Sequence, residues 1–523
     1  MKKIIWLLFL VYFLKELLWL AFIPIWHFPD EEQHFAQTAF GQEKGRMPQG
    51  KENDVNKEID LSSEILGTKR DNQGINKYTY HPEYRLSYTD SQIGLYEAQI
   101  QAFNKQETRQ TMVKQEAARY GPVYYFLTGI GYKIFFEKDL ITRVFAGRII
   151  SVLLSILTLI TTYFIAREIF KDELPRIALT FLVGFTPMFS FVSAGVNSDN
   201  LFNLIFTLIL YSCLKIFFNS LNKARLFLES RAFTVFILIV SLIIGFYTKR
   251  QIFIALPIIL FAFCLSVLIK EGKNKKNNFF ILGLVGLIFL FITKGKIRIP
   301  EYNSGGPILL AENFFQYIYW HLRHTVTETI PWYWGVFNWL GVTLPRWVLR
   351  VQARILIVAV LGFLIHFFKK IKAKNILAIS NLKIFFLLGS GLIYYCSIIC
   401  WDYFFRQGHS FSFGLQGRYF FPTIVSHMLF IILGIALILP RNFGKIVLKT
   451  IIFWWFIFSL IGLSTAVQAY YQLWPLNTFL NEASQYKPIV FKSTGLILIA
   501  LGFFVSSNIL MIKLILFHET KNK

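Results

Sequence analysis

The sequence predicts an all-α polytopic membrane protein with about 12 (11–13) transmembrane helices and a large, partly helical first outer loop. Hydrophobic residues make up 55% of the 523 residues and charged residues only 16%. Mean hydropathy is +0.49, and a water-soluble chain of that composition would expose more apolar surface than it could bury. Phenylalanine is abundant, with 56 residues, which suits helix surfaces that face lipid.

The expected spans follow from the rule that a transmembrane helix needs about 20 mostly apolar residues. We expect them near residues 4–25, 142–166, 177–195, 200–218, 233–248, 251–269, 278–293, 347–368, 377–400, 419–439, 446–467 and 490–512. The first run is too long for a cleaved signal peptide and lacks a small-x-small cleavage site, so we expect it to be retained. The shorter run at 122–136 is interpreted as a short extra helix in the membrane interface.

Basic residues gather in alternate connections between the spans, which predicts the orientation of the chain. Connections of one set contain clusters of Lys and Arg, at 2–3, 167–176, 223–231, 270–276, 369–374 and 441–445. We therefore expect this set, with the N-terminus, to be cytoplasmic. The other set contains a long loop at 26–120 and the conspicuous acids Asp30, Glu31, Glu32, Asp199 and Asp402, which are expected outside.

The chain is interpreted as a single transmembrane domain, 1–523, with 26–120 as the first outer loop and no separate soluble C-terminal domain. Its net charge of +24 is spread over short clusters between apolar runs. Without a basic domain, this charge does not predict binding to nucleic acid. The four cysteines are interpreted as small apolar residues, because Cys396 and Cys400 are one helical turn apart and the others lie inside apolar runs.

The stretch PDEEQHF, residues 29–35, directly follows the first span. In one interpretation it only starts a helix, because Asp30 followed by Gln33 resembles a capping box and acids in a first turn complement the helix dipole. In the other, Asp30 and His34 share a helix face, where a carboxylate can accept a proton or help to hold a divalent cation. The length of the following loop, about 95 residues, favours a functional role.

Two further outer segments carry charged residues of interest. Asp199, in AGVNSDN, either caps the next helix or belongs to a site with Asp30. Lys249 and Arg250, in FYTKRQIF, lie at an outer helix junction, against the positive-inside trend. A misplaced basic pair of this kind predicts an anchor for an anionic headgroup.

Arginines and aromatic residues recur later at the same predicted face. The stretch RQGHSFSFGLQGRYFFP contains Arg406, His409 and Arg418, and the planar fork of arginine can bind two phosphate oxygens at once. The stretch WYWGVFNWLGVTLP, which includes Trp334, is either an interfacial aromatic belt or a wall on which a sugar or lipid stacks.

Candidate bases and cations beside a bilayer fit transfer from a lipid-phosphate donor. A carboxylate would deprotonate an acceptor hydroxyl, which would attack the anomeric carbon of the donor sugar. The cations would stabilise the departing lipid phosphate. A divalent cation, Mg or Mn, held by Asp30, His34 and Asp199 is left open, because the sequence does not give the distances between them.

The same residues resemble a known superfamily. PDE after span one, RYGPVYYFLTG before span two, Asp199 after span three and YTKRQIF between spans five and six resemble landmarks of the GT-C polytopic glycosyltransferases, which use polyprenyl-phosphate sugars. The chain is more similar still to a family of predicted bacterial membrane proteins within that superfamily. The motifs PDE-x-x-H and QGRYF-x-P carry this resemblance, together with TPMFSFVSAGVNSDN and WGVFNWLGVTLP.

The resemblance implies a GT-C-like fold in the bacterial cytoplasmic membrane, with the active site outside. It implies Asp30 as the base, with Glu31 beside it and Asp199 as a second acidic site residue. Substrate-binding residues expected from the outer segments and motifs are His34, Lys249, Arg250, Arg406, His409, Gln416, Arg418, Tyr419 and Trp334. Glu32 is expected to be solvated. The chain lacks the large C-terminal domain of oligosaccharyltransferases, which favours a glycan, envelope polymer or lipid over a peptide as acceptor.

Two alternatives belong to other classes of protein. A transporter or flippase of lipid-linked glycans tends to show internal repeats and ionisable residues near the bilayer midplane. No convincing repeat is present, and Lys15 and Glu16 are the clearest midspan charges, expected to point in different directions around their helix. A non-catalytic relative that only binds polyprenyl lipid is the other alternative.

Overall fold

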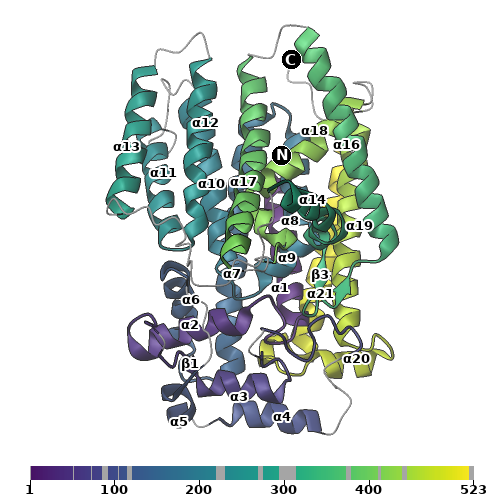
Figure 1. The fold of residues 1–523 in the computed structure, drawn as a ribbon. Coiled ribbons are helices and arrows are strands. Elements are labelled where there is room, and N and C mark those ends of the chain that lie inside the picture. Colours follow the sequence, from purple (N-terminus) through teal and green to yellow (C-terminus); the bar gives the residue numbers. More distant parts are fainter. Residues whose placement is uncertain are drawn as a thin grey trace.

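The computed structural model describes residues 2–50, 52–71, 74–84, 92–103, 105–114, 120–218, 230–268, 275–293, 314–372, 378–409, 414–438 and 444–517. Long helices form a bundle, and a layer of shorter helices covers one end of it (Figure 1). Most of the basic connections that were predicted to be cytoplasmic lie wholly or partly outside the described residues.

The bundle contains a helix for every predicted span. These helices are α1 (Lys2–Phe22), α7 (Leu140–Ile169), α8 (Glu173–Gly184), α9 (Pro187–Ala194), α10 (Asp199–Phe218), α11 (Arg231–Phe246), η2 (Arg250–Ile254), α12 (Ala255–Val267), α13 (Lys275–Thr293), α16 (Arg346–Lys372), α17 (Ile379–His409), η4 (Gly417–Thr423), α18 (Ile424–Ile438), α19 (Gly444–Tyr470) and α21 (Ser493–Ile515). In the described part of the chain, nine segments are long and apolar enough to cross a membrane, and α8 with α9 makes a tenth. The protein is therefore an integral, multi-pass membrane protein, as predicted.

The predicted span at 177–195 is broken rather than continuous. Helices α8 and α9 meet at an angle of 59°, because Pro187 opens α9 and disfavours a helical conformation at the residue before it. The ammonium group of Lys15 donates hydrogen bonds to the Gly184 carbonyl, at the end of α8, and to Ser190, and it forms an ion pair with Glu16. The prediction that Lys15 and Glu16 point apart is therefore wrong, and Lys15 supports the broken span.

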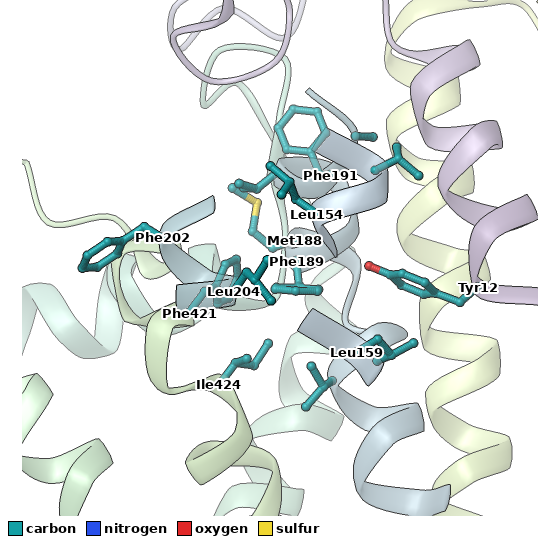
Figure 2. Close-up of a cluster of buried hydrophobic side chains, with 14 of the residues drawn as sticks. Tyr12, Leu154, Leu159, Met188, Phe189, Phe191, Phe202, Leu204, Phe421 and Ile424 are labelled. Carbon is teal, nitrogen blue, oxygen red and sulfur yellow. The ribbon is translucent and has the colours of Figure 1, made fainter. Parts of the chain in front are cut away.

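The core of the bundle lies where α7, α9, α10 and η4 meet α1 and α18. Figure 2 shows Phe189 and Phe191 of α9 among Tyr12, Leu159 and Phe421, which come from three other elements. All of these side chains are buried. This packing brings the first residues of α10 and the η4 turn close to the end of α1, so that segments far apart in sequence reach one place.

The layer at the end of the bundle belongs mainly to the loop at 26–120 after the first span, which is partly helical as predicted. It contains α2 (Glu31–Lys44), β1 (Val55–Asn56), α3 (Lys57–Ile65), α4 (Gln92–Gln101), α5 (Lys105–Gln110), β2 (Met112–Val113) and α6 (Val123–Ile134), with α20 (Leu476–Ala483) and η6 (Ile489–Phe491) from the C-terminal part. Strands β1 and β2 pair antiparallel, with Val55 opposite Val113. Helix α6 is the short extra helix predicted at 122–136.

A second group of short elements follows α13 and precedes α16 in the sequence. It consists of α14 (Phe314–His324), the π-helical turn η3 (Thr325–Thr329), α15 (Ile330–Trp334), and the hairpin of β3 (Val336–Phe337) and β4 (Val342–Thr343). The hairpin contacts the loop at 26–120, because the Tyr80 amide donates a hydrogen bond to the Trp339 carbonyl at 3.1 Å.

Candidate active site

Asp30 lies between two arginines that come from distant parts of the chain. One carboxylate oxygen, Oδ1, accepts a hydrogen bond from Arg70 Nη2 at 2.9 Å, and Oδ2 accepts one from Arg418 Nη2 at 2.6 Å. A third of the Asp30 side chain is still accessible, with an exposed fraction of 33%, whereas that of Arg418 is 4%. Burial alone would raise the pKa of Asp30, but the two arginines outweigh burial and lower it below its usual range.

The backbone at Asp30 is left-handed, with φ 56° and ψ 22°. Helix α2 begins at the next residue, so Asp30 occupies the N-cap position, but its carboxylate makes no capping hydrogen bond. The capping-box interpretation is therefore wrong in this respect. A left-handed aspartate is uncommon and costs conformational free energy, and the pair of arginine contacts stabilises it here.

Glu31 forms a buried ion pair with Arg148. Both side chains are fully buried, and Arg148 donates from Nε and Nη2 to the two carboxylate oxygens at 2.8 and 2.7 Å. Glu31 also accepts the backbone amides of Trp26 and Val196. Because all these partners belong to the protein, the arrangement favours a structural role for Glu31 over the predicted catalytic one.

Glu32 is buried as well, which corrects the expectation that it is solvated. Its Oε1 atom lies 2.6 Å from Arg70 Nε, and only 7% of the side chain is exposed. Burial raises the pKa of Glu32 to about 7, in spite of Arg70. The Arg70 guanidinium also stacks on the Trp339 ring of the β3–β4 hairpin, 4.7 Å from its centroid.

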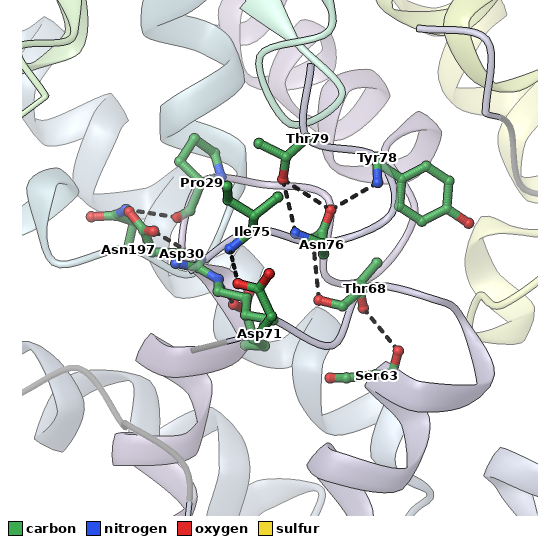
Figure 3. A network of polar contacts seen from close by, with 12 residues as sticks. Pro29, Asp30, Ser63, Thr68, Asp71, Ile75, Asn76, Tyr78, Thr79 and Asn197 are labelled. Carbon is green, nitrogen blue, oxygen red and sulfur yellow. Dashed lines mark hydrogen bonds and ion pairs between the residues drawn. The ribbon is translucent and has the colours of Figure 1, made fainter. Parts of the chain in front are cut away.

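The loop that carries Arg70 is fixed on both sides of this residue (Figure 3). Thr68 receives a hydrogen bond from Asn76 Nδ2 at 3.1 Å, and Asp71 accepts the Ile75 amide at 2.9 Å. These contacts hold the Arg70 backbone in place. Asn197 joins the loop before α10 to the start of α2, because its Nδ2 donates to the Pro29 carbonyl at 2.9 Å.

Asp199 and Lys249 form a further ion pair of the site. Asp199 is the first residue of α10, and its amide donates to Asn197 Oδ1 at 2.8 Å. Asn197 thus makes the turn before α10, and the Asp199 carboxylate is left to bind the Lys249 ammonium group. Lys249 also lies over the Tyr120 ring, 4.5 Å from its centroid.

His34 is held among the aromatic residues of α6 and the segment before it. Its Nδ1 lies 2.8 Å from the Tyr125 hydroxyl, and its ring stacks with the rings of Tyr120 and Tyr125. Burial, reinforced by Lys249, lowers the pKa of His34 to about 3. His34 is therefore neutral at physiological pH and is oriented by a tyrosine.

No group of three His, Cys, Asp or Glu side chains among the described residues is arranged to hold a metal ion. Asp30 is bound by arginines, Asp199 by lysine, and His34 by tyrosine. These residues therefore do not fit a divalent cation in this arrangement, because the cation would have to displace their present partners.

Arg418 is presented by η4, which packs tightly against the segment before the hairpin. A Cβ atom at Gly417 would lie 2.2 Å from Tyr333 N and 2.7 Å from Thr329 O, so only glycine allows this approach. Among the described residues, Arg418 Nε and Nη1 are buried and have no hydrogen-bond partner. The guanidinium also contacts the Tyr419 side chain, and its Nε and Nη1 are buried donors that Asp30 does not engage.

An apolar cavity of about 430 Å³ lies on the other side of η4. Its walls come from η3, α15, α16, α17, η4 and α18, and they include Tyr333, Tyr395, Phe420 and His427. Phe420 lines the cavity two residues after Arg418, so one turn of η4 reaches both the carboxylate and the apolar space. The Tyr333 hydroxyl lies 3.0 Å from His427 Nδ1 and is one of the few polar groups there.

Other predicted binding residues lie elsewhere or at the edge of the cluster. Arg250 is exposed, and Arg406 stacks on Trp320, 4.3 Å from the ring centroid. Trp334 is buried against Trp455 and Phe458 and lines the cavity. Gln416 is the N-cap of η4, Tyr419 lies under the Arg418 guanidinium, and the His409 side chain is outside the described residues.

Sequence reasoning missed Arg70, Arg148 and the cavity. Arg148 left a signal, because a basic residue inside the predicted span 142–166 requires a buried partner. Tyr120 and Tyr125 belong to RYGPVYYFLTG, which was noted only as a resemblance. Arg70 lies in a polar loop, where no spacing distinguishes it from its neighbours.

The fold and the site define an all-α, multi-pass membrane protein that gathers acidic and basic side chains where its helix bundle meets its first loop. The chain belongs to the family of predicted membrane proteins designated DUF2142, whose model matches residues 13–427. No curated relative matches the sequence.

Several solved structures are similar at low identity, among them the following three. ArnT from Cupriavidus metallidurans in the apo state is 11% identical, with a TM-score of 0.36, over 90% of this chain and 74% of that chain. The same protein bound to undecaprenyl phosphate is 12% identical, with a TM-score of 0.33, over 86% and 76%. The archaeal oligosaccharyltransferase AglB from Archaeoglobus fulgidus, in complex with an inhibitory peptide and a dolichol-phosphate, is 12% identical, with a TM-score of 0.42, over 91% and 55%.

Proposed function

We propose that the protein is a membrane glycosyltransferase of the hexosyltransferase type. It moves a sugar from a polyprenyl-phosphate donor to a hydroxyl of a cell-envelope glycan, polymer or lipid at the outer face of the bacterial cytoplasmic membrane. The observation that carries this proposal is the position of η4, which presents Arg418 to Asp30 on one side and Phe420 to the apolar cavity on the other. The resemblance of PDE after span one, Asp199 after span three and YTKRQIF to landmarks of the GT-C glycosyltransferases supports the same donor.

The two sides of η4 match the two parts of a polyprenyl phosphate. The cavity offers apolar surface for the isoprenoid units nearest the headgroup, and two of its walls belong to the membrane-spanning helices α16 and α17. The unused Nε and Nη1 donors of Arg418 suit the phosphate, because charge-assisted hydrogen bonds to phosphate oxygens are strong and arginine can make two in parallel.

In the proposed reaction, Asp30 accepts the proton of the acceptor hydroxyl, and the acceptor oxygen forms a bond to the anomeric carbon of the donor sugar. The bond between that carbon and the phosphate oxygen breaks, and its electron pair leaves with the polyprenyl phosphate. Arg418 stabilises the charge that develops on the leaving phosphate. Lys249, held by Asp199, adds positive charge near His34 on the same side.

The test uses the purified full chain in detergent with a panel of undecaprenyl-phosphate-linked sugars and a polyol acceptor. We expect one donor to be consumed and undecaprenyl phosphate to be released. Asp30→Asn should abolish this release while the variant keeps its elution volume and melting temperature. Donor consumption by the variant at the wild-type rate would disprove the role of Asp30. Transfer requires one compartment and survives in detergent, whereas a flippase would consume no donor.

A further inference from the structure

The base of the proposed reaction is blocked in the structure as it stands. Both oxygens of Asp30 accept hydrogen bonds from arginine, at 2.9 Å from Arg70 and 2.6 Å from Arg418. A carboxylate held in this way is a poor proton acceptor, because taking up a proton would break charge-assisted hydrogen bonds. An additional event must therefore weaken one of these pairs before Asp30 can act.

Arg418 is the arginine that an anionic ligand can draw away from Asp30. It uses one of its nitrogens for Asp30, while Nε and Nη1 are buried without a hydrogen-bond partner among the described residues. A phosphate group offers more acceptor oxygens and more negative charge than one carboxylate. It can therefore engage donors that Asp30 leaves unused.

Arg70 is the arginine that keeps its contact with Asp30. It bridges Asp30 and Glu32, stacks on Trp339, and belongs to a loop segment fixed through Thr68 and Asp71. When Arg418 moves to another anion, this second contact still positions the carboxylate. The two arginines thus have different tasks.

Building on the proposed function, we propose that the phosphate of the donor lipid takes Arg418 from Asp30, so that Asp30 becomes available as the base only in the donor complex. Arg70 is then a positioning residue that holds the freed carboxylate. This exchange prepares the base and the leaving-group contact in a single step, and it leaves the enzyme without a free base when no donor is bound.

The exchange makes Asp30 a competitor of the phosphate, and this has a measurable consequence. Binding of undecaprenyl phosphate alone to the purified full chain in detergent requires no knowledge of the sugar. We expect Asp30→Asn to bind undecaprenyl phosphate more tightly than wild type, with Kd lower by roughly tenfold, because the competing charge-assisted contact is gone. Arg418→Lys should bind more weakly, because it loses the planar fork.

Glu52→Gln is the matched control. Glu52 pairs with Arg46 through two hydrogen bonds at the surface of the same loop, so its substitution also removes one carboxylate from an arginine without touching the site. Its Kd should equal that of wild type. Asp30→Ser, which also lacks the charge, repeats the measurement if the asparagine variant does not fold.

The outcomes separate the two proposals. Tighter binding by the Asp30 variants, with unchanged binding by Glu52→Gln, supports the exchange. Saturable binding by wild type with equal or weaker binding by the Asp30 variants overturns the exchange and leaves the donor class standing. No saturable binding of undecaprenyl phosphate to wild type overturns the proposed donor, and the exchange with it.

Discussion

At the scale of single residues, three consecutive carboxylates have three different environments. Asp30 is a third exposed and lies between two arginines, Glu31 is fully buried against Arg148, and Glu32 is buried against Arg70. The three residues are neighbours in the sequence, but successive side chains at the start of a helix point in different directions. The partners that each meets therefore decide what each carboxylate can do.

The buried Glu31–Arg148 pair gives a prediction about stability. Glu31→Gln leaves the Arg148 charge uncompensated inside the protein, which costs about 3–5 kcal/mol of the free energy of unfolding. We expect a clear fall in the melting temperature of the purified protein. Glu52→Gln breaks an arginine pair at the surface and should leave the melting temperature nearly unchanged. A Glu31→Gln variant of unchanged melting temperature but lost activity would restore the predicted catalytic role.

Glu32 gives a prediction about pH. Burial raises its pKa from the usual 4.5 to about 7. In that interval the folded protein holds more protons than the unfolded chain, so stability decreases as pH rises through it. Glu32→Gln removes this dependence, and its melting temperature relative to wild type should be higher at pH 8 than at pH 5. Glu64→Gln, at an exposed position of α3, is the control and should give a constant difference. A constant difference for Glu32→Gln as well would contradict the raised pKa.

At the scale of elements, the short helix η4 determines the geometry of the site. It connects α17 to α18, and its first residue, Gly417, touches the backbone of Tyr333 and Thr329. The motif QGRYF-x-P therefore has a physical meaning: glycine allows the close approach, arginine reaches Asp30, and the phenylalanine at 420 lines the cavity.

Gly417→Ala tests this role of η4. The added methyl group overlaps two backbone atoms, so η4 must shift, at a cost of about 1–3 kcal/mol. We expect weaker binding of undecaprenyl phosphate, because the shift moves Arg418. Gly283→Ala, in α13, meets open space and should leave binding unchanged. Wild-type affinity in Gly417→Ala would show that the position of η4 does not control the phosphate contact.

The elements themselves were largely predictable from the sequence, because apolar runs of span length are a strong pattern. The break between α8 and α9 was signalled by Pro187 but was hidden inside a continuous apolar run. Helix α6 was expected from its short apolar run, and the left-handed Asp30 was not expected at all. The hydrophobic pattern of the sequence predicts which residues form a helix. Bends and caps depend on residues that are neighbours only in the folded structure, such as Lys15 at the break between α8 and α9.

At the scale of the whole molecule, the site exists only through the tertiary fold. Asp30, Arg70, Asp199, Lys249 and Arg418 come from five separate segments. The sequence analysis named four of these five as candidates, because a carboxylate or a cation at the end of a predicted span stands out against the apolar residues. It could not find which acid pairs with which cation, nor the cavity, because these follow from how α15 to α18 pack.

The contact between Asp30 and Arg418 can form only late in the synthesis of the chain. The two residues are 388 positions apart, and at a synthesis rate of about 5–20 residues per second Asp30 waits roughly 20–80 s for its partner to be made. During that interval Arg70 can already pair with Asp30, because it is only 40 positions away in the sequence and is synthesised much earlier than Arg418. The nascent chain can thus neutralise Asp30 early, and the candidate site is completed only when the chain has been made as far as Arg418.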